Sequence, residues 1–560
     1  MSEMECDTGG NGSVPDTDHT GSVTYSPSEA EEEEGRTRLQ GSSGCSQRWL
    51  LALMGCFGGI MVESGRAGLS VAIVCMVNDT DSNYSDPANS SSLSTEHDEF
   101  YWSKAEQSGM LSAYFYGYMV IQIPGGWLAG RHGGKNVMFI GMLIGSIASL
   151  LLPIGARTSK YLVYVLRGLV GISQGVYLFS MHTMWGKWAP PLERTKLLAV
   201  AYAGPKIGSI AVFAMSGYLC KYGFDNGWAS MFYLSGGISV IWCGVWYYTV
   251  ASTPSQHPWI SQQEKNYITR SIGETKASYP TPWGAMLMSP ATWVCVIGHV
   301  CFNWIAYTLT TNTPLFLKEV MNFDITENGL LSSMTFASQA VSAVLTGQLA
   351  DYFRSKKYLS TTATRRLFQS IAFLGAGVCL LGTGFVDAEH RYVAIALLTI
   401  AMWFMGVSTA GYLVNFVDFA PRHAGILVGI SNTIASLPGM VAPLLAGALT
   451  PHKSQEEWRN VFYVCAGFCV LGIVVFGTQA RGELQYWAVD QVEMEVVEEQ
   501  RVSMFEKVPD FQDASLDAFK YVISSDKQTK VPDDVLGNNT PAIAPDKETD
   551  IVANSDTSTV

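Results

Sequence analysis

The sequence predicts an all-α membrane protein whose twelve transmembrane helices form two six-helix repeats. Three observations lead to this prediction. Apolar residues make up 48% of the 560-residue chain and charged residues only 15%, whereas a soluble domain carries about 25% charged residues. Twelve separate apolar segments reach the roughly 20 residues that a helix needs to cross a bilayer core of about 30 Å. A polar stretch divides these segments into two groups of six.

Each apolar segment is predicted to form one membrane helix. Most of the segments contain several glycines, and such small residues let neighbouring membrane helices pack closely. Alternation with a period of two is weak throughout, which disfavours a transmembrane β-barrel. The twelve helices are expected near residues 49–77, 108–130, 136–155, 161–184, 196–220, 228–251, 292–317, 327–350, 366–386, 391–415, 424–449 and 461–479.

Charge is concentrated in the two ends of the chain. Residues 1–48 hold ten acidic and three basic side chains, and residues 480–560 hold 17 acidic and seven basic ones. Because the whole chain has a net charge of −13, the part between them carries about +4. The acidic ends are predicted to be disordered tails. An acidic chain of this kind argues against a nucleic-acid partner.

The sequence also argues against an enzyme. It contains no GxxxxGK[ST] phosphate-binding loop, no nucleophile–base pair and no cluster of metal ligands. We therefore predict no catalytic residue, no cofactor and no metal site, and we expect any driving force to come from an ion gradient or the membrane potential.

The polar stretch 252–291 contains five prolines and is predicted to link two related halves. The segment Gly126–Ala129 with Lys135 has a counterpart in Gly347–Ala350 with Lys356, each after the second helix of its half. A second pair of similar segments follows the fourth helix of each half: Trp-Ala-Pro at 188–190 and Phe-Ala-Pro at 419–421. Parallel repeats are typical of secondary transporters. The expected domains are a tail (1–48), a six-helix bundle (49–251), a linker (252–291), a second six-helix bundle (292–479) and a tail (480–560).

Basic residues in the loops predict the orientation, because cytosolic loops are rich in Lys and Arg. An even number of helices places both tails on one side. The loops on that side carry Arg131, Lys135, Lys187, Arg194, Lys196, Arg354, Lys356, Lys357, Arg365, Arg366 and Arg422. The opposite loop 78–107 holds seven acidic residues, one lysine and three glycosylation sequons, at Asn78, Asn83 and Asn89. Both tails are therefore expected in the cytosol.

The eleven cysteines are not expected to form a disulfide framework. Most of them lie inside apolar runs, where a free thiol behaves as a small hydrophobic side chain. This set comprises Cys56, Cys75, Cys243, Cys295, Cys301, Cys379 and Cys465. There is no CxxC pair, so structural zinc is not expected either.

Ionisable side chains inside membrane segments need an explanation, because they are costly there and usually face a cavity or a partner. Glu63 and Arg66 lie three residues apart on one predicted helix and can meet on one face. Either they neutralise each other as a local ion pair, or Arg66 faces a central cavity. Arg167 has no acidic neighbour within a helical turn, so it either binds a substrate anion through its planar fork or pairs with a distant acid.

Three further groups allow two interpretations each. Lys206, next to Pro205, either adds positive potential to an anion path or lies at a helix kink and extends to the cytosolic surface. His182 is either part of a proton relay or a helix-end histidine bonded to a backbone carbonyl. His299 is expected to be a satisfied interhelical donor rather than a coupling site. Cationic groups outnumber acidic ones in these segments, so the expected substrate is an anion.

Several longer motifs resemble those of the major facilitator superfamily, in particular its anion–cation symporter family. That family includes sialin, the vesicular glutamate transporters and the type I sodium–phosphate cotransporters. The resemblance runs from about residue 49 to 489 and is greatest to the sialin branch. It rests on Tyr-Gly-Tyr at 116–118, Gln-Ile-Pro-Gly-Gly at 122–126, Trp-Ala-Pro-Pro-Leu-Glu-Arg at 188–194, Asp-Phe-Ala-Pro at 418–421 and the run 424–433 leading to Pro-Gly-Met-Val at 438–441.

The resemblance implies that Arg167 and Arg66 bind the substrate, and that His182 matches a histidine of the family pattern. Gln174 stands where sialin and the glutamate transporters have a glutamate linked to proton coupling. Because a neutral amide does not exchange a proton near neutral pH, potential-driven or sodium-coupled transport becomes the alternative, with His182 and Glu63 as other coupling candidates. Phe302 replaces a second cavity arginine of the glutamate transporters, a charge that Lys206 is a candidate to supply.

The expected protein is a carrier of organic anions, of the sialic acid or acidic amino acid type, that works by alternating access in the bilayer. It would be driven by co-transported H⁺ or Na⁺ or by the membrane potential. The loops holding Gly126 and Lys135, and Gly347, Asp351 and Lys356, would latch its cytosolic side. Alternatives are a sodium-dependent phosphate or organic anion cotransporter and a non-transporting sensor or chloride-conducting protein.

The expected location is a lysosomal or vesicular membrane, with the plasma membrane as the alternative. The final residues Ser558-Thr559-Val560 are a candidate ligand for a PDZ domain, which binds peptides by strand addition.

Overall fold

The structure is a computed structural model that describes residues 46–77, 99–272 and 281–488. The sequons at Asn78, Asn83 and Asn89 and the candidate PDZ ligand at Val560 lie outside these residues, as does most of each predicted tail. The described part is helical, and its one β-bridge is an isolated pair between Val77 and Phe100.

Long helices occur at all twelve predicted positions, and their ends differ from the predicted ends by six residues at most. In the first half they are α2 (Gln47–Met76), α3 (Lys104–His132), α4 (Gly134–Thr158), α5 (Lys160–Trp188), α6 (Arg194–Tyr222) and α7 (Trp228–Thr249). In the second half they are α10 (Pro290–Glu319), α11 (Ile325–Ser355), α12 (Thr361–Thr383), α13 (Arg391–Val407) with α14 (Tyr412–Phe419), α15 (Ala424–Ile434) with α16 (Leu437–Leu449), and α17 (Gln455–Gln479).

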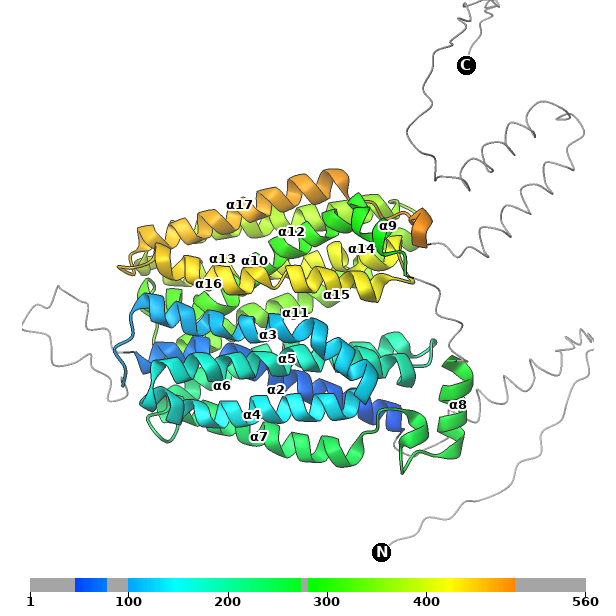
Figure 1. Cartoon of the computed structure of the whole chain (residues 1–560). Coiled ribbons are helices and arrows are strands. Elements are labelled where there is room, and N and C mark those ends of the chain that lie inside the picture. The colour runs from blue at the N-terminus through cyan, green and yellow to red at the C-terminus, as the bar shows by residue number, and fades with distance from the viewer. Residues whose placement is uncertain (1–45, 78–98, 273–280, 489–560) are drawn as a thin grey trace, which may run out of the picture. The chain divides into compact units, whose positions relative to one another are not determined.

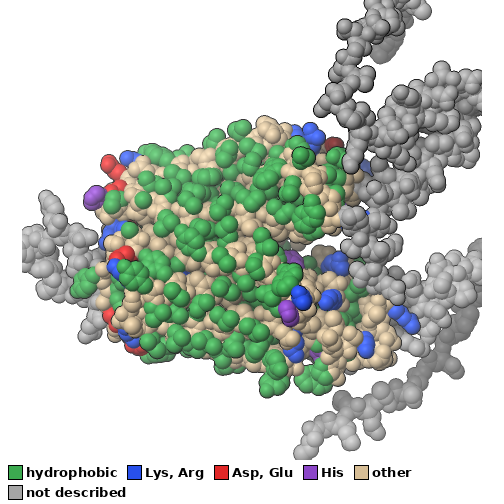
Figure 2. All heavy atoms as spheres, viewed as in Figure 1, with side chains coloured by type: hydrophobic (Ala, Val, Ile, Leu, Met, Phe, Trp, Pro, Cys, Tyr) green, Lys and Arg blue, Asp and Glu red, His purple; other side chains and the backbone are tan. Residues whose placement is uncertain are grey.

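Ten of these segments, within the described residues, are long and apolar enough to cross a membrane. The other two, α3 and α11, have 29 and 31 residues but carry more polar side chains, among them Gln122 and Gln339. Hydrophobic side chains cover the sides of the helical body, whereas most charged ones lie at its two ends (Figure 2). This distribution suits a protein whose flanks face lipid. The predicted all-α membrane fold is therefore confirmed.

The helices of each half pack mainly among themselves. In the first half α2 contacts α6, α3 contacts α5, and α4 contacts both α5 and α7. In the second half α12 packs on α13 and α17, and α10 on α16 and α17. Figure 1 shows the two groups as a blue-to-green and a green-to-orange set of helices. In the sequence, the two halves are separated by the short helices η1 (Pro254–Gln256), α8 (Gln262–Ile272) and α9 (Trp283–Met288).

The two ends of the helical body can be told apart by the chain segments that lie there (Figure 1). We call the end where α2 and α6 begin and α8 lies the linker face. The other end, where α2 ends and α3 begins, is the loop face. Local signals define the helix starts on the loop face: Ser103 with Glu106, and Ser454 with Glu457, form capping boxes at α3 and α17.

Two spans of the second half are interrupted near their middle. The helix α13 gives way to η3 (Ser408–Ala410) before α14, and α15 ends at Ile434, before α16 begins. Backbone groups freed in a membrane span need partners from neighbouring helices. At the first break, Gln369 accepts a hydrogen bond from the Tyr412 amide at 3.1 Å, and Arg365 donates to the Ala410 carbonyl at 2.9 Å.

One cysteine prediction was wrong. Cys75, expected to be a free thiol, forms a disulfide with Cys220, 145 residues away in the sequence. The bond joins the loop-face ends of α2 and α6, which pack on each other along their lengths. Neither local composition nor spacing shows this pairing, because it depends on the tertiary contact of two helices. The cysteines found free in the described residues include the other six of the set expected to be free.

Candidate substrate-binding site

The charged groups in the middle of the first half begin with Glu63 and Arg66 on α2. Arg66 Nη2 lies 2.5 Å from Glu63 Oε1, and the Glu63 side chain is 2% exposed. Ser209 on α6 donates a second hydrogen bond to the same carboxylate oxygen, at 2.9 Å. Gly204 and Gly208 make this contact available, since the α2 backbone near Cys56 and Ile60 leaves no room for a Cβ atom at either position.

Arg66 also faces the second half, so the two interpretations of this residue are compatible. Its guanidinium carbon lies 5.6 Å from the centre of the Tyr307 ring on α10. Its Nε is buried without a hydrogen bond. The side chain is therefore paired with Glu63 and at the same time placed at the boundary between the halves.

Arg167 on α5 is 1% exposed and has no carboxylate partner among the described residues. Its Nη1 donates to the Gly65 carbonyl at 2.7 Å and its Nη2 to the Arg66 carbonyl at 3.2 Å, while Nε has no partner. The Tyr114 ring centre lies 5.2 Å from the guanidinium carbon. Arg167 thus binds the α2 backbone at the turn that carries Arg66, and adds a second positive charge there.

Lys206 lies near the middle of α6 and is solvent-exposed. Its Nζ donates at 3.0 Å to Oε1 of Gln339 on α11. Since Gln339 belongs to the second half, Lys206 points into the interface between the halves, and water reaches that interface at mid-span. Gln339, which the sequence reasoning did not single out, supplies a neutral partner to a charged group.

A second polar contact between the halves lies on α3. Gln122 donates to Ser436 Oγ and accepts from Thr433 Oγ1, both at 2.8 Å. Tyr118 accepts from the Asn432 amide at 2.6 Å. These partners flank the break between α15 and α16. The motifs at 116–118, 122–126 and 424–433 predicted the family, but nothing in their spacing predicted that they contact one another.

Contacts between the halves are confined to mid-span and to the loop face in the described residues. Towards the loop face, the Phe213 ring on α6 stacks on Phe336 of α11 at 4.7 Å between centres. Gly217 and Gly329 bring the same two helices into backbone contact. At the loop face Lys104 forms an ion pair with Glu319, which also accepts from Trp458 Nε1 at 3.1 Å. Here the halves are closed.

Towards the linker face, by contrast, the described residues have no hydrogen bond or ion pair between the halves. The hydrogen bonds between the halves that lie nearest to the linker face are those of Gln122 and Lys206. Figure 2 shows the surface hollowed between the two halves at this end. Of the central cations, Lys206 is thus the solvent-exposed one, whereas Arg167 is 1% exposed, and the halves are closed on the loop-face side of the group.

The predicted coupling residues are not brought together. Glu63 belongs to the central group, Gln174 has no hydrogen bond to another side chain in the described structure, and His182 is exposed on α5. His182 bonds the Tyr202 hydroxyl on α6, with Nδ1 at 3.1 Å, rather than a backbone carbonyl. His299 is buried and bonds Ser431 at 2.9 Å, as expected for an interhelical contact.

The two predicted latch loops each bind their own half. The Lys135 amide donates to Ser252 Oγ at 3.3 Å, and its carbonyl accepts from Trp246. Asp351 lines a cavity of about 670 Å³ together with Arg354 and Lys357, on the loop that carries Lys356. Gly126 packs beside Phe179, whereas Gly347 has open space around it.

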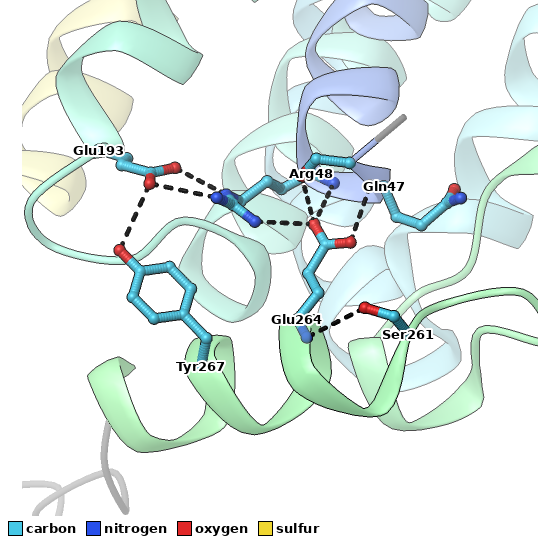
Figure 3. Close-up of polar contacts among 7 residues, drawn as sticks. Gln47, Arg48, Glu193, Ser261, Glu264 and Tyr267 are labelled. Carbon is cyan, nitrogen blue, oxygen red and sulfur yellow. Dashed lines mark hydrogen bonds and ion pairs between the residues drawn. The ribbon is translucent and has the colours of Figure 1, made fainter. Parts of the chain in front are cut away.

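Sequence reasoning missed a polar network that fastens α8 to the first half (Figure 3). Arg48 at the start of α2 pairs with Glu193 at 2.6 Å and with Glu264 of α8 at 3.0 Å. Glu264 also accepts from Ser46 Oγ and from the Gln47 and Arg48 amides, so it caps α2. Burial alone raises the pKa of Glu264, but these hydrogen bonds and the Arg48 charge outweigh it and lower the pKa below its ordinary value.

The two-half architecture matches a known protein family. The model of the Major Facilitator Superfamily matches residues 55–364 and 357–485. The chain belongs to the major facilitator superfamily. Similar structures support this fold: an inward-facing bacterial homologue of the human lysosomal transporter Spinster has a TM-score of 0.60 at 15% identity, covering 78% of this chain and 97% of that one. A D-xylose–proton symporter has a TM-score of 0.56 at 15% identity, with 77% and 98% covered.

Within the major facilitator superfamily, the chain belongs to the anion–cation symporter family of sialin and the vesicular glutamate transporters. It is 39% identical to the uncharacterized transporter slc-17.2 of Caenorhabditis elegans over 79% of this chain and 93% of that protein. It is 38% identical to human sialin, with 80% and 92% covered. For vesicular glutamate transporter 1 of Xenopus laevis the identity is 35%, with 80% and 77% covered. These names are those of transporters rather than enzymes.

Proposed function

We propose that this protein carries organic anions, of the sialic acid or acidic amino acid type, across a membrane by alternating access. The observation that carries the proposal is the group of three cations, Arg66, Arg167 and Lys206, near the interface of the two halves. One of them is solvent-exposed in mid-span, and among the described residues Glu63 is the only carboxylate beside them. Relatives named sialin and vesicular glutamate transporter support the substrate class.

Arg66 and Arg167 act as one unit in this proposal, because Arg167 binds the carbonyl of Arg66. A substrate carboxylate would approach from the linker face and bind the Arg66 guanidinium over Tyr307. Rocking of the halves would then open the loop face by breaking the Lys104–Glu319 contact, and would bring the loops at Lys135 and Lys356 against the opposite half.

The test is counterflow in proteoliposomes, with labelled anions from a panel that includes sialic acid, glutamate and aspartate. We expect wild-type uptake, at least tenfold less uptake for Arg66→Gln, and an unchanged elution profile on size exclusion. Lys160→Gln is the matched control, because it removes a partly exposed cation from the same half, at the loop-face start of α5. Equal uptake by wild type and Arg66→Gln would refute the assignment, and absence of counterflow for every anion would favour a sensor or channel.

The orientation proposed is cytosolic for the linker face and lumenal or extracellular for the loop face. The Cys75–Cys220 disulfide at the loop face supports this, because disulfides persist in oxidising compartments rather than in the cytosol. The membrane proposed is lysosomal or vesicular, with the plasma membrane as the alternative, and the relative named vesicular glutamate transporter supports a vesicular one. The sidedness would be tested by mapping the glycan sites and asking whether an enzyme added outside intact vesicles removes the glycans.

Coupling is proposed to differ from proton symport through position 174. A neutral amide there does not take up and release protons, which favours sodium or the membrane potential as the driving force and keeps a sodium-dependent phosphate or organic anion cotransporter as the second candidate. Uptake measured with the pH gradient collapsed, the voltage clamped and sodium varied separates these cases. Transport that stops once the pH gradient is collapsed, whatever the sodium concentration, would point to proton coupling through Glu63 or His182.

A further inference from the structure

The interior of the described membrane spans has an excess of two positive charges. Away from the helix ends, the charged side chains are Glu63, Arg66, Arg167 and Lys206. Glu63 and Arg66 neutralise each other as an ion pair. Arg167 and Lys206 have no carboxylate partner among the described residues. Uncompensated charge within a membrane protein is costly, so a ligand that brings two negative charges would relieve both.

Lys206 has free capacity to bind one of the two negative charges of such a ligand. An ammonium group has three hydrogen-bond donors, and the described structure shows one of them used, on the neutral amide oxygen of Gln339. The lysine is solvent-exposed, whereas Gln339 is buried. An anionic group that reaches Lys206 therefore needs to displace one neutral hydrogen bond at most.

The two cationic centres lie close enough to bind one small molecule. Ser209, three residues after Lys206 and hence on the same face of α6, donates to Glu63 at 2.9 Å. Glu63 in turn pairs with Arg66. Lys206 on one side and the Arg66–Arg167 unit on the other therefore flank the same carboxylate, at the interface between the halves.

Resting on the proposed function, we infer that the preferred cargo is a dianion, with one acidic group bound by the Arg66–Arg167 unit and the second by Lys206. The second acidic group replaces Gln339 as the partner of Lys206. Because that hydrogen bond joins α6 to α11, a dianion removes a contact between the halves when it binds, and a monoanion leaves it in place. Lys206 is thus a specificity-determining residue.

The experiment compares pairs of probes that differ in a single charge. The pairs are N-acetylglutamate and N-acetylglutamine, succinate and succinamate, and phthalate and its monoamide. Binding is measured on full-length protein in nanodiscs at pH 7.5, by thermal shift and by competition with a radiolabelled member. For each pair of which a member binds, we expect wild-type protein to bind the dianion at least tenfold more tightly than the matching monoanion.

Four variants then test which residues cause the preference for dianions. Lys206→Gln should lower dianion affinity at least tenfold and leave monoanion affinity within threefold, whereas Lys206→Arg should keep the preference. Gln339→Glu offers Lys206 an internal carboxylate and should also abolish the preference. Gln339→Leu removes only the displaced partner and should retain it.

The outcomes separate this inference from the proposed function. Equal binding of both members of each pair, or a Lys206→Gln variant that still prefers dianions, would overturn the inference while leaving anion transport intact. Failure of all six probes to bind wild-type protein would contradict the anion site itself and, with it, the proposed function.

Discussion

Arg167 shows how a buried cation is held without an acidic partner among the described residues. Its two terminal nitrogens donate to consecutive carbonyls on α2, which are neutral but strongly polar acceptors. Helical carbonyls are normally used within their own helix, so the arginine also holds α5 against α2 at this turn. At the residue scale, substrate binding and helix packing are therefore not independent for this side chain.

Glu63 is the residue whose removal tests the balance of charge in the centre. Glu63→Gln leaves Arg66 without its carboxylate and raises the interior excess charge from two to three. We expect the variant to unfold at a lower temperature, because breaking a buried pair costs about 3–5 kcal/mol and Arg66 is 17% exposed, which reduces that cost. Differential scanning fluorimetry in detergent measures the unfolding temperature of the variant and of the wild type.

The same variant should regain part of its stability when a bound anion supplies the missing negative charge. Ser209→Ala is the matched control, since it removes one hydrogen bond to Glu63 and no charge. A Glu63→Gln variant as stable as wild type without any anion would show that the pair contributes nothing.

At the scale of helices, α3 and α10 are joined at the loop face by Lys104 and Glu319. Both side chains are largely buried, at 10% and 5% exposure. Glu319→Gln should therefore shift the protein towards a loop-face-open state, because it removes an ion pair that exists only when the halves meet. Spin labels on non-canonical amino acids at the loop-face ends of α3 and α10 should show a longer distance population.

A weaker pair on the same face provides the comparison. Lys221 and Asp324 join α6 to α11 at 3.7 Å with both side chains about half exposed. Exposed pairs contribute about 0–1 kcal/mol, so Asp324→Asn should leave the label distances nearly unchanged. Asparagine retains the helix cap that Asp324 provides to α11. Equal effects of both substitutions would contradict a special role for Glu319.

The helix α8 gives a prediction about pH. The pKa of Glu264 is lower in the folded protein than in an unfolded chain. Its contribution to docking is therefore complete above the unfolded pKa of about 4.3 and is lost as pH falls through the folded value. The protection of the α8 amides against hydrogen exchange, relative to an unfolded chain at the same pH, should stay high from pH 8 to 5 and fall below about pH 4.

Glu264→Gln should produce fast α8 exchange already at pH 7, where wild type is protected. Lys265→Gln, a neighbour on the same helix, is the control. Protection of α8 that is insensitive to both pH and Glu264→Gln would mean that apolar packing alone, around Ile268, holds the helix.

How far the sequence predicts this protein also depends on scale. Hydropathy is local, so the twelve spans were predicted to within a few residues. The break at Ser408–Ala410 was not, since it depends on Gln369 and Arg365 from another helix. The sequence showed that Arg167 has no acidic neighbour within a helical turn but left a distant acidic partner open, and the Lys206–Gln339 contact joins residues 133 positions apart. Pairings of this kind need the tertiary arrangement.

At the scale of the whole molecule, the Cys75–Cys220 disulfide ties the first and fifth spans together at the loop face. Its removal by Cys220→Ser should lower the free energy of unfolding by about 2–4 kcal/mol, read as a lower melting temperature. An impermeant reductant applied to the cytosolic side of sealed vesicles should leave the protein unaffected. Reduction from that side would contradict the proposed orientation, and Cys243→Ser should have a far smaller effect.

The contact between Gly217 and Gly329 has a consequence for electrical insulation. A carrier that exploits a gradient must keep its closed face impermeable to water and small ions. Two helices that meet backbone to backbone, with no room for a Cβ atom on either one, leave no channel beside the stacked rings of Phe213 and Phe336. A methyl group at Gly217 would force α6 and α11 apart at this seal. The membrane would then carry a leak current, and the driving force for the cargo would be dissipated.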